Sequence, residues 1–145
     1  MYIRKTPITV TVLETANPIV KTSVGVIEKY DHNTGWLKFN KRAQVNIDEA
    51  KEIRNKGMGL FNHAKYMMVI DTRGTYANGS MEALNYLALD EKLNELCIAQ
   101  AIIVDNLAVS LLANFYVSIM SRNSNVKLFK NEVEAIQWLS SKETS

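Results

Sequence analysis

The fold of this chain is decided by residues 65–93, which read KYMMVIDTRGTYANGSMEALNYLALDEKL. An apolar run from Tyr66 to Ile70 ends at Asp71, a polar stretch with two glycines follows, and a helical pattern begins at Ser80. A buried strand, a polar loop and a helix N-terminus form the arrangement on which α/β domains usually place their binding groups. The segment therefore predicts an α/β fold and indicates where a site should be sought.

On the N-terminal side of this segment the sequence favours antiparallel strands. Residues 8–14 and 19–30 are rich in Val, Ile and Thr, whose branched side chains suit a pleated strand. Residues 31–35 are dense in turn formers, and 36–39 follow as a hairpin partner. We expect a β meander, and then a helix that Asn46 caps.

On the C-terminal side strands and helices alternate. We expect a helix over 80–96, a strand over 98–104, a helix over 107–120, a strand over 126–129 and a last helix that Asn131 caps. The strand at 98–104 is apolar at every position but Gln100. Strands that alternate with helices need crossover connections, so this half should form a parallel sheet.

The fold class that follows is α/β, in a single domain that covers residues 1–145. Its mixed sheet should contain an antiparallel meander and then parallel βα units, with about five or six strands and about four helices. Residues 140–145 are expected to form a disordered tail.

Composition limits the setting and the partners. The 145 residues fit one domain, and a net charge of +2 is too small to indicate nucleic acid or an anionic membrane. Cys97 is the one cysteine in the sequence, so no intramolecular disulfide can form, which favours a reducing compartment. No apolar run approaches the ~20 residues that span a bilayer, and the N-terminus lacks the apolar region of a signal peptide. We expect a cytoplasmic protein with no membrane span.

The order of elements, together with segment 65–93 and the ending at 126–139, resembles the small STAS domains of SpoIIAA-like type and their SEC14-like relatives, in particular uncharacterised bacterial members. In the antagonist members a partner kinase phosphorylates a serine at the start of the helix after the loop, and the phosphate switches partner binding. By position Ser80 would be that serine, although its context here is Asn78-Gly79-Ser80-Met81 instead of the usual Asp-Ser-Ser-Gly. The SEC14-like relation implies an apolar ligand between helix and sheet.

The candidate binding or regulatory site lies in the loop at 72–80. Asp71 and Arg73 sit at the carboxyl end of an expected central strand, where open α/β sheets bind ligands, and Tyr76 could pack over a polar ligand there. A phosphate on Ser80 would meet the positive end of the helix dipole. The alternative is structural: Asp71 organises the loop amides, Arg73 is solvated, and Ser80 is a plain N-cap.

A second candidate surface lies on the helix at 107–120. Its polar residues recur every four positions, and the rest of the helix is apolar, which exceeds the stripe needed to cover a sheet. The surplus indicates a homodimer contact, cover by a neighbouring helix, or a lipid-like pocket. The residues that would form this surface are Leu112, Phe115, Tyr116 and Ile119.

Catalytic and metal-binding patterns are sparse. His32 and His63 stand at no metal-ligand spacing, no Gly-x-Ser-x-Gly elbow is present, and Cys97 begins a buried strand. We therefore expect no enzyme activity, no metal and no cofactor. The leading hypothesis is a non-enzymatic binding or regulatory module that acts on a protein partner through loop 72–80 and the helix after it.

Two other hypotheses stay open. One is a carrier of a lipid or another small apolar ligand. The other is a hydrolase, for which Ser80, Asp71 and a histidine would have to converge.

Overall fold

The structure, a computed structural model, describes residues 18–120 and 125–142. These residues build a six-stranded sheet in the order β1-β2-β3-β5-β7-β8 and a small sheet of β4 and β6. The strands are β1 (Ile19–Lys21), β2 (Gly25–Asp31), β3 (Thr34–Phe39), β4 (Gln44–Val45), β5 (Tyr66–Asp71), β6 (Asn78–Gly79), β7 (Cys97–Ile103) and β8 (Val126–Phe129).

The sheet is mixed, as the sequence predicts. Strands β1, β2 and β3 pair antiparallel, whereas β3–β5, β5–β7 and β7–β8 pair parallel. The strand predicted at 66–71 is β5, and it lies inside the sheet between β3 and β7. The prediction of a meander followed by parallel strands is confirmed.

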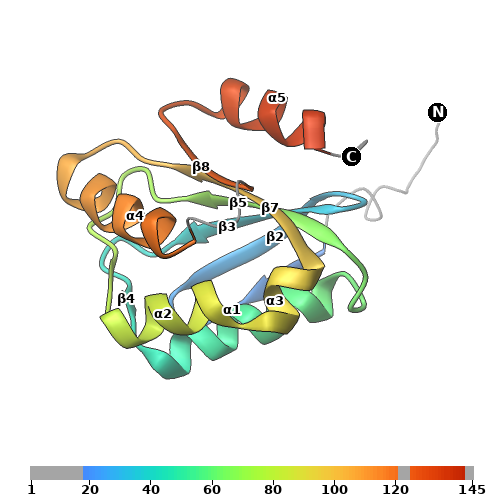
Figure 1. Cartoon of the computed structure of the whole chain (residues 1–145), viewed down its shortest axis with the longest axis horizontal. Coiled ribbons are helices and arrows are strands. Elements are labelled where there is room, and N and C mark those ends of the chain that lie inside the picture. Colours follow the sequence, from blue (N-terminus) through green and yellow to red (C-terminus); the bar gives the residue numbers. More distant parts are fainter. Residues whose placement is uncertain (1–17, 121–124, 143–145) are drawn as a thin grey trace, which may run out of the picture.

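Helices cover both faces of the sheet. Figure 1 shows α5 alone on one face and the other four helices on the opposite face. The helices are α1 (Ile47–Leu60), α2 (Met81–Leu89), α3 (Glu91–Leu96), α4 (Leu107–Ile119) and α5 (Glu132–Lys142).

The central strands are buried on both faces because their side chains alternate between the two layers. Met67 and Val69 of β5 pack in the core that includes Leu139 of α5. Met68 and Ile70 of the same strand pack toward the layer of the other helices. A strand buried on both sides reads as a continuous apolar run, which is what the sequence shows here.

The first third of the chain differs in one respect from the prediction. The run at 19–30 is not one strand: it turns between β1 and β2, where the Thr22 N–H donates to the Gly25 carbonyl at 2.8 Å. A Cβ at Gly25 would lie 2.3 Å from the Lys38 carbonyl oxygen, so the close approach of β3 requires glycine. The strand predicted at 8–14 lies outside the described residues.

The helix predicted over 80–96 is wrong as a single element, because it breaks at Asp90 into α2 and α3. The Asp90 N–H still bonds the Tyr86 carbonyl and closes α2, while its carboxylate accepts the Leu93 N–H at 2.9 Å and caps α3. This break gives five helices among the described residues.

The disordered tail predicted at 140–145 is wrong for its first three residues. Helix α5 continues to Lys142, after a start at which the Asn131 side chain accepts the Glu134 N–H as predicted. Residues 143–145 lie outside the described residues.

Candidate functional site

Asp71, the first candidate of the loop site, is 3% exposed and points inward at the end of β5. Its carboxylate accepts hydrogen bonds from the Arg73 backbone N–H at 3.1 Å, from the Arg73 guanidinium at 2.9 Å and from the Trp36 indole at 3.2 Å. Burial opposes ionisation, but these bonds outweigh it and lower the pKa of Asp71 to about 2. The carboxylate is therefore charged and fully engaged within the protein.

Arg73 links the loop to α5. Its guanidinium contacts the Glu132 carboxylate at 3.1 Å as well as Asp71, and both partners raise the pKa of Arg73. The Arg73 carbonyl oxygen in turn accepts a hydrogen bond from Lys38 Nζ at 2.6 Å. These contacts hold the start of the loop on the α5 side of the sheet.

The other two loop candidates lie elsewhere. The Ser80 hydroxyl accepts the Ala83 N–H at 3.1 Å and is the N-cap of α2, on the opposite side of the sheet from α5. Tyr76 is 63% exposed, and its ring lies 5.6 Å from the Arg42 guanidinium carbon. The four candidates therefore do not converge on one point, and Asp71 and Ser80 both fill structural roles.

The hydrolase arrangement is not assembled. His32 and His63 adjoin the starts of β3 and β5, whereas Asp71 ends β5. The length of β5 separates the two ends by roughly 17 Å at the usual rise per residue. Burial raises the pKa of the Cys97 thiol to about 12, so that side chain is an uncharged, apolar group.

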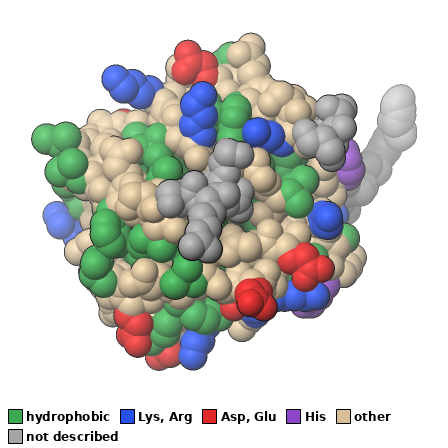
Figure 2. Space-filling view, viewed as in Figure 1, with side chains coloured by type: hydrophobic (Ala, Val, Ile, Leu, Met, Phe, Trp, Pro, Cys, Tyr) green, Lys and Arg blue, Asp and Glu red, His purple; other side chains and the backbone are tan. Residues whose placement is uncertain are grey.

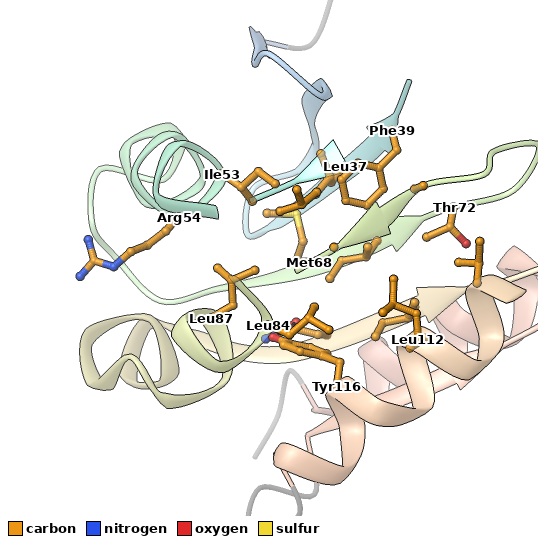
Figure 3. A pocket seen from close by; sticks show the side chains of 18 of the residues that line it. Leu37, Phe39, Ile53, Arg54, Met68, Thr72, Leu84, Leu87, Leu112 and Tyr116 are labelled. Atoms are coloured by element: carbon orange, nitrogen blue, oxygen red, sulfur yellow. Dashed lines mark hydrogen bonds between the residues drawn. The ribbon is translucent and has the colours of Figure 1, made fainter. Parts of the chain in front are cut away.

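A cavity of about 140 Å³ lies between the sheet and the layer of α1 to α4. Strand side chains and helix side chains point toward one another across it (Figure 3). Arg54, the charged residue of the lining, points away from the others in the view and pairs with Asp90 at 2.8 Å. Labelled apolar residues that line the cavity include Leu37, Met68, Leu84, Leu87, Leu112 and Tyr116.

The cavity accounts for part of the apolar surplus on α4. Leu112 and Tyr116, two residues of the predicted surface, line it. Phe115 and Ile119, the other two, are partly buried against the core cluster that contains Tyr116. The opposite side of α4, which carries Leu107 and Leu111, remains exposed.

Gln100 is the functional candidate that sequence reasoning missed. It lies on β7, lines the cavity, and is only 5% exposed. Its Oε1 accepts the Tyr116 hydroxyl at 3.0 Å. The available signal was its position as the one polar residue of the predicted strand at 98–104.

A mixed sheet in which antiparallel β1, β2 and β3 precede parallel β5, β7 and β8, with helices on both faces, makes this chain an α/β domain of SpoIIAA-like fold. An uncharacterised protein of the DUF3478 family from Shewanella loihica PV-4, with a SpoIIAA-like fold, matches this structure with a TM-score of 0.52. The match covers 86% of this chain and 92% of that chain at 14% sequence identity. At this identity the likeness shows the fold alone, and it confirms the SpoIIAA-like resemblance.

The chain belongs to DUF7793, a family described as a domain of unknown function, whose model matches residues 32–143. A search of curated proteins finds no match.

Two further findings concern sites and membranes. Within 18–120 and 125–142, no three His, Cys, Asp or Glu side chains are grouped so that they could hold a metal ion. Among the helices of the same ranges, none has the length and apolarity that crossing a bilayer requires.

Proposed function

We propose that this chain is a non-catalytic binding domain whose cavity takes a small apolar ligand. The observation that carries the proposal is the cavity itself, which is lined mainly by apolar side chains of the sheet and of the helices above it. We favour this function over a regulatory module that acts through loop 72–80, because the side chains of Asp71 and Ser80 already form internal hydrogen bonds.

The size and lining of the cavity support this function. Protein interiors are packed to nearly crystalline density, and voids much larger than a water molecule are few. An engineered apolar cavity of about 150 Å³ binds benzene, and this cavity holds about 140 Å³. Apolar side chains that line such a space lack packing partners on the side that faces it. A ligand that fills it restores the lost contacts.

The direct test is binding of a small apolar probe, ethylbenzene, followed by protein NMR or calorimetry. Ala113 lines the cavity on α4, so Ala113→Leu should fill part of it and weaken binding by at least about tenfold. Ala108 lies on the exposed side of the same helix, and Ala108→Leu should leave binding unchanged. Failure of the wild type to bind ethylbenzene up to its solubility would contradict the proposal, as would equal affinities of the two variants.

The second candidate is a protein-binding or regulatory module that works through loop 72–80 and α2 and self-associates through α4. The observation that favours it is a set of exposed apolar side chains near the loop and on α4. Hydrophobic side chains gather at the left of Figure 2, the side on which Figure 1 places the start of α4. Exposed members of this set are Tyr76 at 63%, Met81 at 59%, Leu107 at 74% and Leu111 at 62%.

Self-association tests the α4 part of this candidate. If a second copy covers the exposed side of α4, the double variant Leu107→Glu, Leu111→Glu should be monomeric at concentrations where the wild type sediments as a dimer. Val133 is equally exposed, at 64%, on the far helix α5, so Val133→Glu should not change the sedimentation. A wild type that stays monomeric at high concentration in analytical ultracentrifugation would remove the dimer.

A further inference from the structure

The sheet side of the cavity carries a buried amide in apolar surroundings. Gln100 stands in register between Met68 of β5 and Val126 of β8, and only 5% of it is exposed. Its Oε1 accepts the hydroxyl of Tyr116, which reaches down from α4. The hydroxyl therefore holds one side of the amide and fixes the direction of the other.

The Nε2 group of this amide has no hydrogen-bond partner among the residues that the structure describes. It donates no hydrogen bond to any group within residues 18–120 and 125–142, whereas the neighbouring side-chain donors on this face are engaged: the Thr72 hydroxyl, for example, donates to the Ile103 carbonyl at 2.7 Å. In the same ranges Asn94 Oδ1 is the one fully enclosed side-chain atom without a partner, and Gln100 Nε2 is not such an atom. Since Gln100 lines the cavity, its free N–H donors are reachable from there.

Most buried polar atoms have at least one hydrogen-bond partner, and a buried amide donor without one is unfavourable. On the strand face, Val126 beside Gln100 has no side-chain acceptor, and Met68 offers only a weakly accepting thioether sulfur. A ligand in the cavity that carries an acceptor would satisfy the Nε2 donor. The hydrogen bond would also hold that acceptor at one defined position. The amide is thus placed as a selectivity group for whatever fills the cavity.

We propose that the ligand of this cavity is an apolar molecule with one uncharged oxygen acceptor, of carbonyl or ether type, which accepts a hydrogen bond from Gln100 Nε2. The inference rests on the proposed apolar-ligand function and narrows it to a chemical class. A carboxylate fits poorly, because the charged residue of the lining, Arg54, is already paired with Asp90 and points away. A charge buried without a partner is strongly disfavoured.

A matched pair of probes tests the acceptor. Acetophenone and α-methylstyrene have the same planar shape, but the first carries a carbonyl oxygen where the second carries a methylene group. Each is titrated by calorimetry into the wild type and into Gln100→Met, which keeps the length of the side chain and removes its amide. Acetophenone should bind about tenfold more weakly to the variant, while α-methylstyrene should bind at least as well as to the wild type.

Ala108→Leu serves as the control, because Ala108 lies on the exposed side of α4, outside the cavity lining, and the substitution keeps the amide of Gln100. The preference for acetophenone, measured against α-methylstyrene, should survive in it. A second measurement uses the wild type alone and does not depend on the folding of a variant. In a nitrogen-15 NMR spectrum, acetophenone should shift the side-chain amide signals of Gln100 more than α-methylstyrene does.

The possible failures are distinguishable. If both probes bind and Gln100→Met changes their affinities equally, or the two probes shift the amide signals equally, the proposed hydrogen bond to an oxygen acceptor is wrong. The proposal that the cavity binds an apolar ligand would still hold. If neither probe binds the wild type, the proposed function fails and the inference fails with it.

Discussion

At the scale of single residues, Asp71 shows how a carboxylate is kept inside the protein at a strand end. The bonds from Arg73 and Trp36 replace its hydration and hold its pKa at about 2, against an ordinary value of 3.8. Because the folded-state pKa lies below the unfolded one, the ionised carboxylate stabilises the fold at neutral pH. That contribution is lost as the pH falls from about 4 to about 2.

Asp71→Asn should therefore destabilise the domain in a pH-dependent way. The lowered pKa corresponds to roughly 2 kcal/mol of unfolding free energy at pH 7, at about 1.4 kcal/mol per pH unit. Urea unfolding at a series of pH values measures it, and the gap between wild type and variant should close toward pH 2. Glu28 is an exposed carboxylate on β2, and Glu28→Gln should show no comparable gap. A gap that is the same at pH 7 and pH 2 would contradict the assignment.

Ser80 acts through its hydroxyl, which caps α2. Ser80→Ala removes that acceptor and should lower the unfolding free energy by about 1 kcal/mol. Ser80→Asp keeps an acceptor at the cap and adds a charge that the helix dipole favours, so its stability should match or exceed that of the wild type. Thermal unfolding of the three proteins gives the order, and an aspartate variant weaker than the alanine variant would rule out the capping role.

At the scale of elements, the sequence predicts those whose pattern is local. Strand β5 is predicted because its apolar run ends at a polar loop, and β8 is predicted at its observed bounds. The small β4–β6 sheet has two residues in each strand, too few for a periodicity to show. The break in the helix at Asp90 was missed because Leu89 and Leu93 continue the apolar pattern across it. The clue was the residue type: aspartate favours the N-cap position, where its carboxylate accepts the backbone N–H three residues later, as Asp90 does from Leu93.

Asp90 has two roles at this break, and two substitutions separate them. Asp90→Ala removes both the cap of α3 and the ion pair with Arg54, and should cost about 2 kcal/mol. Asp90→Asn keeps a good cap and loses the charge, so it should cost about half as much. Urea unfolding measures both, with circular dichroism to follow helix content. An alanine variant with more helix and greater stability would show that Asp90 does not impose the break.

At the scale of the whole molecule, no single segment of the sequence predicts the cavity. Its lining comes from β3 to β7, from the loop after β5 and from all four helices on that face, so the residues extend from Leu37 to Tyr116. Each apolar residue of the lining has the sequence pattern of an ordinary core residue. A side chain that is packed against its neighbours and one that lines a cavity produce the same hydrophobic periodicity. Gln100 departs from this pattern, because it is a polar residue within a buried strand. The loop site was predictable in position for the opposite reason, since its residues are contiguous, but their inward bonds depend on Trp36 and Glu132 from distant segments.

A ligand in this cavity would join the sheet to the helices above it and so should stabilise the domain as one unit. A ligand present at one hundred times its dissociation constant adds about 2.7 kcal/mol to the unfolding free energy. For a chain of this size that raises the melting temperature by roughly 5–11 °C. Ala113→Leu should melt higher than the wild type without ligand, because it fills part of the void, and should respond much less to added ethylbenzene. Differential scanning calorimetry compares the two proteins with Ala108→Leu as the control. A variant that melts lower than the wild type and gains as much from the probe would mean that the space beside Ala113 is not where the ligand binds.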